Sequence, residues 1–402
     1  MRLPGADTVV VRYSGEIGTK SSAVQRRMER RLADNLEAML EARDVPGEVE
    51  LHPTRPLVRT DGPGAAARAA EAAADVFGVV SASPARSVPP EFDAILDALS
   101  EAGRACYDGG SFAVSARRAG TDYPFTSHDV EVDGGAAVFE AVADRFEPAV
   151  DLDDPDHTFG VEVRPEETFV YTGTVDGPGG LPLGSQAPLV ALVSGGIDSP
   201  VAAYEVMRRG SPIVPVYLEL GEFGGPDHEA RAMETVSTLS RYAPGRDLGV
   251  WRVPAGDDLA DFAAEIESGR MLVFRRYMLA VAERIARREG AHGVVTGEAL
   301  GQKSSQTVQN LAVTSAATDL PVHRPLLAMD KAAIVERARA IGTFADSTIP
   351  AGCNRLAPSR PETGGSLAGV RSLEPDDLAE RTERAASRAE RVAPVELPDV
   401  VG

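Results

Sequence analysis

The stretch that decides the fold is Ala187–Tyr204, which reads APLVALVSGGIDSPVAAY. Its apolar run, Leu189–Val193, predicts a buried strand, and Ser194–Ser199 predicts a glycine turn that leads into a helix. Pro200 falls in the first turn of that helix, where proline is accepted because the first helical amides have no partners within the helix. We therefore expect an α/β domain that begins with this strand, turn and helix.

The turn has the chemistry of an anion-binding site. Gly195 and Gly196 can adopt positive φ and let the backbone approach a ligand, and successive amides at a helix N-terminus bind anionic oxygens. Ser194 and Ser199 add hydroxyl donors. Asp198 would repel a phosphate directly, so we expect it to act through Mg²⁺. The turn lacks the Gly-Lys-Ser/Thr ending of a Walker loop, and an ordinary glycine turn is the alternative interpretation.

The hexapeptide Ser194–Ser199, SGGIDS, resembles the pyrophosphate-binding loop of the PP-loop ATP pyrophosphatases. Those enzymes activate a substrate oxygen by adenylation and release pyrophosphate. The resemblance implies that ATP and Mg²⁺ are the cofactors.

The composition limits the class of protein. A chain of 402 residues suggests two to three domains, and 43% hydrophobic residues fit a soluble protein. No apolar run approaches the ~18 residues of a membrane span, and the N-terminus lacks the apolar core of a signal peptide. Two cysteines cannot form a disulfide framework. We expect a cytoplasmic protein in a reducing compartment, with no membrane partner.

The charge balance is strongly acidic, with 61 acidic and 41 basic residues and a net charge of −20. Such a balance argues against nucleic-acid binding, because phosphate contacts supply most of that affinity. Scarce lysine and abundant alanine favour another explanation, which is a halophilic protein adapted to a salty cytosol where charge is screened. A local basic patch can persist inside an acidic total.

Residues 1–60 predict a strand over 8–13, a loop over 14–20, a helix over 22–43 and strands near 48–51 and 57–60. The helix has an apolar face made by Leu32, Leu36, Met39 and Leu40. A basic group precedes and begins this helix: Lys20, Arg26, Arg27, Arg30 and Arg31. These side chains either form a solvated helix face or contact a phosphate backbone.

Residues 64–174 predict helices over 64–77, 90–107 and 127–146, with strands near 78–83, 111–118, 158–163 and 167–174. The strand over 111–118 ends in Arg117 and Arg118, which either contact RNA or pair with surface carboxylates. Cys106 is expected to be a small packed residue. Asp176–Ser185 is rich in glycine and proline, so it predicts a linker.

Residues 186–360 alternate strand and helix, which predicts a doubly wound parallel sheet with helices on both faces. We expect further strands at 213–218 and 293–296, and helices at 229–242, 259–267 and 270–288. Ligands bind at the carboxyl ends of such strands. Ser194–Ser199, Tyr217–Glu219 and the residues from Gly297 onward should therefore surround one crevice.

Three later stretches carry further polar chemistry. Thr296–Gln306 (TGEALGQKSSQ) follows a strand as a nucleotide-contacting turn would. In Leu320–Lys331, Arg324 and Lys331 face either a pyrophosphate or RNA, or form structural salt bridges. Cys353 lies in a Gly/Pro-rich stretch with nearby arginines that could lower its pKa and make it reactive, and an inert exposed thiol is the alternative interpretation. One charged helix is expected over 375–391, followed by an irregular acidic end.

Taken together, these stretches resemble the ThiI family of tRNA 4-thiouridine synthetases in family order over residues 8–362. Gly15-Glu16-Ile17 with Lys20-Ser21 resembles its ferredoxin-like module, and the Ala-Arg-Arg strand end with Tyr123-Pro-Phe-Thr-Ser127 resembles a THUMP domain. The resemblance implies an α/β and α+β multidomain fold. Its parts are a ferredoxin-like module (1–62), a THUMP domain (63–174), a linker (175–186), a PP-loop domain (187–362) and a charged tail (363–402), with no rhodanese domain.

The resemblance also implies a reaction. Uridine O4, at position 8 of tRNA, is adenylated by ATP, and a persulfide on the catalytic Cys353 delivers sulfur to C4. The residues implied at the nucleotide, with Asp198 also catalytic and holding Mg²⁺, are Leu192, Val193, Ser194, Gly195, Gly196, Asp198, Ser199, Tyr217, Leu218, Arg275, Gly297 and Gln306. Arg276 adjoins Arg275 and is the alternative there. The residues implied in tRNA binding are Lys20, Arg26, Arg27, Arg117 and Arg118.

The implied partners are tRNA and a cysteine desulfurase or other persulfide donor. A homodimer is also considered, and the thiol that resolves Cys353 is left open. Two rival functions remain: sulfur transfer to a ThiS-like carrier of the thiamine pathway, and an RNA-binding THUMP protein whose catalytic half is inactive. The complete SGGIDS loop and Cys353 argue against the inactive alternative.

Overall fold

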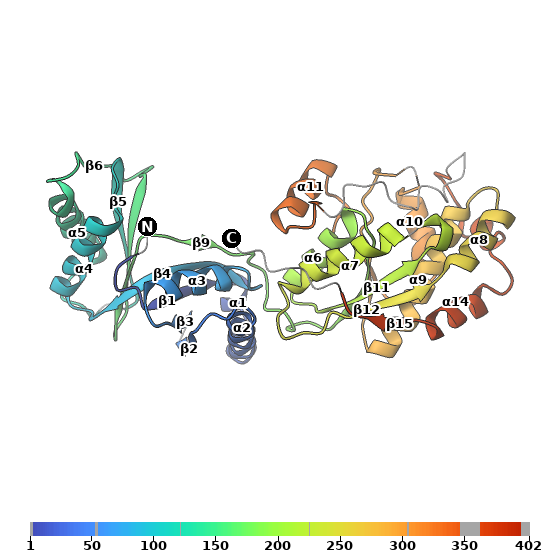
Figure 1. Cartoon of the computed structure of the whole chain (residues 1–402), viewed down its shortest axis with the longest axis horizontal. Helices are drawn as coiled ribbons and strands as arrows, with labels where there is room; N and C mark the ends of the chain where they lie inside the picture. Colours follow the sequence, from blue (N-terminus) through green and yellow to red (C-terminus); the bar gives the residue numbers. More distant parts are fainter. Residues whose placement is uncertain are drawn as a thin grey trace. The chain divides into compact units, whose positions relative to one another are not determined.

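The computed structural model describes residues 3–52, 55–120, 122–224, 226–303, 305–345 and 362–394. They form two compact units, Met1–Pro182 and Leu183–Gly402; Figure 1 labels many of their elements. Among these described residues, no helix is both long enough and apolar enough to cross a membrane. Cys353 lies outside the described residues.

The first unit is built on one nine-stranded sheet with strand order β2-β3-β1-β4-β8-β7-β5-β6, and β9 pairs with β4. Its elements are β1 (Thr8–Tyr13), α1 (Gly15–Gly18), α2 (Ser22–Ala42), β2 (Glu48–His52), β3 (Arg55–Arg59), α3 (Pro63–Ala74), β4 (Val79–Val88), α4 (Phe92–Cys106), β5 (Ser111–Arg118), α5 (Ser127–Val142), β6 (Ala149–Val150), β7 (His157–Val163), β8 (Thr168–Tyr171) and β9 (Val175–Asp176).

The long strand β4 joins the two halves of this sheet. Its first part pairs antiparallel with β1, and its second part pairs with β8 as well. The elements β1, α2, β2, β3, α3 and β4 form a ferredoxin-like βαββαβ order, while α4, α5 and β5 to β8 form the rest. A single sheet therefore runs through both predicted modules.

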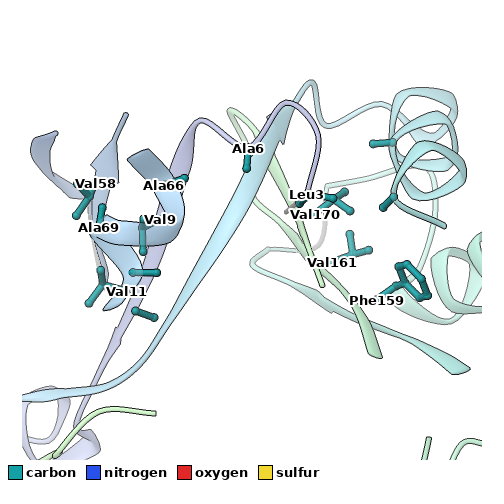
Figure 2. Packing of buried hydrophobic residues seen from close by; sticks show 14 of the residues in the cluster. Leu3, Ala6, Val9, Val11, Val58, Ala66, Ala69, Phe159, Val161 and Val170 are labelled. Carbon is teal, nitrogen blue, oxygen red and sulfur yellow. The ribbon is translucent and has the colours of Figure 1, made fainter. Parts of the chain in front are cut away.

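Small residues bring the helices of the first unit close to the sheet. In α3, Ala66 and Ala69 are fully buried and lie beside Val9 and Val58 of the sheet (Figure 2). The predicted apolar face of α2 is confirmed, since Leu32 and its three partners at helical spacing are at most 3% exposed. Period-3.6 patterning places them on one face of the helix.

One local prediction in this unit is wrong. Residues 14–20 were expected to be a loop, but Gly15–Gly18 form α1, and the Ser14 hydroxyl accepts a hydrogen bond from the Glu16 amide. The turn forms because Ile17 is fully buried against Met28 and Leu181. Tertiary packing of one apolar side chain outweighs the glycines on either side of it.

The second unit is built on a six-stranded sheet with strand order β14-β13-β10-β11-β12-β15. Its elements are β10 (Leu189–Leu192), α6 (Asp198–Arg208), β11 (Ile213–Glu219), η1 (Gly221–Phe223), α7 (Pro226–Ser240), β12 (Val250–Pro254), α8 (Gly256–Glu265), α9 (Arg270–Glu289), β13 (Val294–Val295), α10 (Val308–Ser315), β14 (Val322–His323), α11 (Lys331–Ala340), α13 (Leu367–Arg371), α14 (Leu378–Ser387) and β15 (Glu390–Val392).

The sheet is doubly wound, as expected. The chain steps from β10 to β11 and β12 on one side, then returns to β13 and β14 on the other side of β10. All these neighbours pair in parallel. Because right-handed crossovers that reverse direction place their helices on opposite faces, α6 and α7 cover one face and α9 covers the other. The strand order therefore reverses between β10 and β13, where such folds bind ligands.

The C-terminal part differs from its prediction. The expected helix over 375–391 is shorter, Leu378–Ser387, and Glu390–Val392 form β15, which pairs antiparallel with β12 at the edge of the sheet. Arg381 and Arg384 of α14 both reach Asp258 of α8, at 3.4 and 3.1 Å. Asp258 also accepts a hydrogen bond from Tyr277 of α9, and burial together with this bond raises the pKa of that tyrosine. These contacts make α14 and β15 part of the second unit.

Candidate active site

The glycine loop between β10 and α6 is closed by its own two serines. The Ser194 amide donates to the Ser199 hydroxyl at 2.9 Å, and the two hydroxyl oxygens lie 3.0 Å apart. The Gly196 amide donates to the Ser194 hydroxyl at 3.3 Å. These hydroxyls hold the shape of the loop, and Asp198 stands at the first position of α6.

The reason given from sequence for the two glycines was wrong in part, because neither Gly195 nor Gly196 has a positive φ. Gly195 is favoured by space: a Cβ there would lie 3.1 Å from the Cβ of Arg231 on α7, a tight contact that α7 would have to relieve. Gly297, after β13, is tighter still, since a Cβ would lie 2.7 Å from the Ser199 backbone nitrogen. Glycine at these positions lets the loop, α7 and the end of β13 pack together.

A cavity of about 250 Å³ opens at the carboxyl ends of β10, β11 and β13. It lies at the reversal of strand order, where the sequence placed the crevice. The structure brings together around it all twelve residues that the resemblance implied at the nucleotide: Leu192, Val193, Ser194, Gly195, Gly196, Asp198, Ser199, Tyr217, Leu218, Arg275, Gly297 and Gln306.

Other lining residues were not found from the sequence. An apolar wall comes mainly from α9, with Met271, Phe274 and Met278 on one face of that helix, and Leu220 and Leu279 beside them. The spacing of 271, 274 and 278 is the available signal, but it marks only a buried face. His228 is a further polar lining residue without a sequence signal, whereas Thr296, Glu298 and Lys303, which also line the cavity, belong to the Thr296–Gln306 stretch that the sequence placed there. An apolar wall opposite an amide-rich loop fits a ligand with a flat ring at one end and anionic oxygens at the other.

Fixed charges border the cavity on two sides. Lys331 Nζ lies 2.8 Å from Asp198 Oδ1. Glu298 pairs with Arg275 at 3.3 Å and with Arg324 at 2.8 Å. The two cations for which the sequence left a choice, Arg324 and Lys331, therefore both form ion pairs.

The choice between two neighbouring arginines on α9 is also visible. Arg275 lines the cavity, and its Nη1 donates to the Ser305 carbonyl at 3.4 Å. Arg276 points elsewhere: it is 5% exposed, donates to the Val313 carbonyl at 2.7 Å and pairs with Glu374. Arg275 is thus the arginine with access to a ligand in the cavity.

The residues expected to bind RNA belong to the first unit. Lys20, Arg26, Arg27 and Arg117 are exposed. Arg118 is half-buried and donates to the Phe125 carbonyl. Its guanidinium carbon lies 5.6 Å from the ring centroid of Tyr123, within the distance of about 6 Å expected for a cation–π pair. Cys106 packs partly buried against the core of this unit, as expected for a small packed residue.

Three family models match successive parts of the chain. The ThiI ferredoxin-like domain matches residues 8–83, the THUMP domain matches residues 90–172, and the thiamine biosynthesis protein ThiI matches residues 184–376. These ranges follow the order of modules that the sequence motifs implied.

Curated relatives match along almost the whole chain. A probable tRNA sulfurtransferase of Halobacterium salinarum is 61% identical over 377 residues, covering 94% of this chain and 95% of the relative. Probable tRNA sulfurtransferases of Aeropyrum pernix and Methanosarcina acetivorans are 44% and 39% identical, covering 84% and 89% of this chain, and 84% and 86% of those relatives.

Solved structures agree with these matches. A crystal structure of a 4-thiouridine synthetase–RNA complex with bound ATP has a TM-score of 0.82 and 28% identity, covering 96% of this chain and 98% of that one. A protein of Pyrococcus horikoshii has a TM-score of 0.64 and 25% identity, covering 84% and 99%. On the strength of its modules, its relatives and its fold, the chain belongs to the ThiI family of tRNA sulfurtransferases.

Proposed function

We propose that this protein is an ATP-dependent tRNA sulfurtransferase that makes 4-thiouridine at position 8 of tRNA. The observation that carries the proposal is that one cavity at the reversal of strand order combines the glycine loop, the apolar wall of α9 and the Thr296–Gln306 stretch. The similar 4-thiouridine synthetase holds ATP and RNA, and the relatives are named tRNA sulfurtransferases.

ATP fits the polarity of this cavity. The apolar face of Met271, Phe274 and Met278 suits an adenine ring, and the loop amides with the N-terminus of α6 suit the phosphates. In the first step, uridine O4 attacks the α-phosphorus, the bond to the β-phosphate oxygen breaks, and pyrophosphate leaves. Positioning and charge neutralisation supply most of the catalysis in such a transfer.

Mg²⁺ is part of the proposal, and the residues present fit it. Asp198 lines the cavity with a side chain that is 28% exposed, and only its Oδ1 is engaged by Lys331. Mg²⁺ is commonly held by one or two carboxylates together with substrate phosphates and water. Asp198 would hold the ion, which would neutralise the charge of the phosphates. Lys331, which is paired with Asp198, would add a second positive charge beside the phosphate oxygens.

The second step uses Cys353, whose place in the fold lies outside the described residues. A persulfide donor, such as a cysteine desulfurase, loads Cys353 with a terminal sulfur. That sulfur attacks C4 of the adenylated uridine and AMP leaves. A second thiol then attacks the Cys353 sulfur, which breaks the S–S bond, releases 4-thiouridine and leaves a disulfide. In the proposal, the attacking thiol comes from an external molecule.

The exposed basic residues of the first unit bind the tRNA.

Two measurements test this function. Trp251 is the sole tryptophan, and it lies buried in β12 of the second unit. The fluorescence of Trp251 during unfolding should show that ATP, at a concentration a hundred times its Kd for the protein, raises the free energy of unfolding of this unit by about 2.7 kcal/mol. Nucleoside analysis of tRNA from a deletion strain should show loss of 4-thiouridine, with recovery on re-expression. Normal 4-thiouridine together with a thiamine requirement would instead indicate the ThiS-like carrier as the acceptor, and normal 4-thiouridine without one would indicate the inactive RNA-binding protein.

A further inference from the structure

Arg231 of α7 is a buried cation whose charge is not balanced within the described part of the chain. It is 6% exposed, and among the described residues its Nη1 has no hydrogen-bond partner and its guanidinium forms no ion pair. Arg276 is buried to the same degree, but it donates to the Val313 carbonyl and pairs with Glu374. Buried charges in proteins are normally paired in this way, because an unpaired one is costly. Arg231 therefore lacks the anion that a buried guanidinium requires.

Two carboxylates of the surrounding elements are already engaged by other cations. Glu229, on the same helix as Arg231, lies 2.9 Å from Arg252. Asp198, where the glycine loop enters α6, lies 2.8 Å from Lys331. The anion that balances Arg231 is therefore expected to come from a bound molecule.

The stem of Arg231 lies against the first glycine of the loop. A Cβ on Gly195 would be 3.1 Å from Arg231 Cβ, 3.7 Å from Arg231 Cδ and 3.3 Å from the His228 carbonyl oxygen. Because residue 195 is glycine, it places no side chain between the loop and the arginine. His228, Gly195 and Gly196 all line the cavity. Arg231 thus lies beside the part of the cavity that the loop forms.

This part of the cavity suits anionic oxygens, because the loop leads directly into the N-terminus of α6. Two other cations at the cavity, Arg275 and Lys331, are paired with Glu298 and Asp198. Each pair carries little net charge toward a ligand. Arg231 differs from both, since no carboxylate of the described chain offsets its charge.

We propose that Arg231 neutralises the β- and γ-phosphates of ATP across Gly195, and with them the pyrophosphate that leaves. The proposal rests on the proposed function and adds a residue to its first step. When uridine O4 bonds to the α-phosphorus, the bond from that phosphorus to the bridging oxygen breaks, and its electron pair leaves with pyrophosphate. A fixed cation at this end stabilises the charge that develops there.

The affinities of three ligands test the proposal. Isothermal titration calorimetry on the full chain gives the Kd of ATP, AMP and pyrophosphate, each with Mg²⁺. Arg231→Met keeps a stem of similar length and removes the charge. It should weaken the binding of ATP and pyrophosphate by roughly tenfold to a hundredfold, because hydrogen bonds between charged groups are the strong ones. AMP lacks the β- and γ-phosphates, so its Kd should stay within about threefold of the wild-type value.

Stability without ligand separates a binding role from a structural one. In thermal unfolding followed by Trp251 fluorescence, Arg231→Met without nucleotide should have a Tm equal to or above that of the wild type, because it loses an unpaired buried charge. ATP should raise the Tm of the wild type more than that of the variant, since a ligand stabilises according to its affinity. A lower Tm of Arg231→Met without nucleotide would mark a structural role and overturn the proposal.

Thr235→Val is the matched control. Thr235 lies one turn after Arg231 on α7, is fully buried, and has a hydroxyl without a hydrogen-bond partner among the described residues. The substitution alters the same face of the helix without changing its charge, so the Kd of all three ligands should equal the wild-type values. Arg231→Lys restores a cation and should bind pyrophosphate more tightly than Arg231→Met. An Arg231→Met protein that binds pyrophosphate as Thr235→Val does, or that loses AMP as much as ATP, would overturn the proposal.

The wild type distinguishes this inference from the proposed function. If the wild type binds neither ATP nor pyrophosphate, the proposed function fails. If it binds both, and Arg231→Met binds them equally well, only the role of Arg231 fails.

Discussion

Replacing Glu298 with glutamine tests whether this carboxylate balances two cations at the cavity wall. The side chains of Glu298, Arg275 and Arg324 are 12%, 16% and 10% exposed, and the closer ion pair measures 2.8 Å. Removing one partner of a fully buried pair costs about 3–5 kcal/mol, because the remaining charge is left uncompensated. Residual exposure screens these groups, so we expect Glu298→Gln to cost roughly 1–3 kcal/mol.

The assay is urea unfolding followed by the fluorescence of Trp251. This residue lies in the same unit as Glu298 and is 6% exposed, so its signal reports the unfolding of that unit. A unit of this size loses about 2–4 °C of Tm per kcal/mol. The expected loss for Glu298→Gln is therefore roughly 2–12 °C in a parallel thermal scan.

Glu383→Gln supplies the control, because Glu383 pairs with Arg284 at 2.9 Å but is 72% exposed. An exposed pair contributes at most about 1 kcal/mol. If the two substitutions lower the free energy of unfolding equally, or if Glu298→Gln does not lower it, the burial of Glu298 does not make its ion pairs more stabilising than an exposed pair.

Three further predictions concern stability and RNA binding. Substitution of two adjacent glycines of α5 by alanine should change the free energy of unfolding in opposite directions, as circular dichroism during urea unfolding can show. Gly135 has open space around it, so Gly135→Ala should raise the free energy of unfolding by about 0.5–1 kcal/mol. A Cβ on Gly134 would lie 2.6 Å from Leu99, so Gly134→Ala should lower it. Burial raises the pKa of Glu167, but hydrogen bonds led by the one from Arg59 outweigh burial and leave the pKa below its ordinary value. The ionised pair therefore stabilises the fold above about pH 4.3, and this stabilisation is lost as the pH falls further. The difference in free energy of unfolding between wild type and Arg59→Ala should consequently shrink from pH 6 to pH 3. Finally, tRNA affinity measured by filter binding should persist in molar KCl, and complete loss above ~0.5 M would contradict the halophilic interpretation.

The sequence predicted the sheet of the second unit well because its signals are local. The apolar strand before SGGIDS and the alternation after it specify a parallel sheet, and the topology then brings Tyr217, Arg275, Gly297 and Gln306 to one cavity. The short strand β12 and helices α10 and α11 were not predicted. Their positions depend on partners far away in sequence, as β12 shows by pairing with both β11 and β15.

Other features could not be predicted because they depend on packing between distant segments. Asn310 has no sequence signal of its buried hydrogen bonds, which form only where α10 meets Glu362–Gly365. Nor does the sequence show that Glu298 pairs with two arginines from α9 and the end of β14. The expected positive φ at Gly195 failed for the same reason, since the constraint there comes from Arg231 on α7.

The most direct test of the account compares Asp198→Asn and Cys353→Ser in single turnovers with ATP, a tRNA transcript and a persulfide donor. Asp198→Asn should slow pyrophosphate release and 4-thiouridine formation together. Cys353→Ser should still release pyrophosphate but form no 4-thiouridine, because activation of the uridine and delivery of sulfur are separate steps. A Cys353→Ser protein that thiolates tRNA at the wild-type rate would contradict the account.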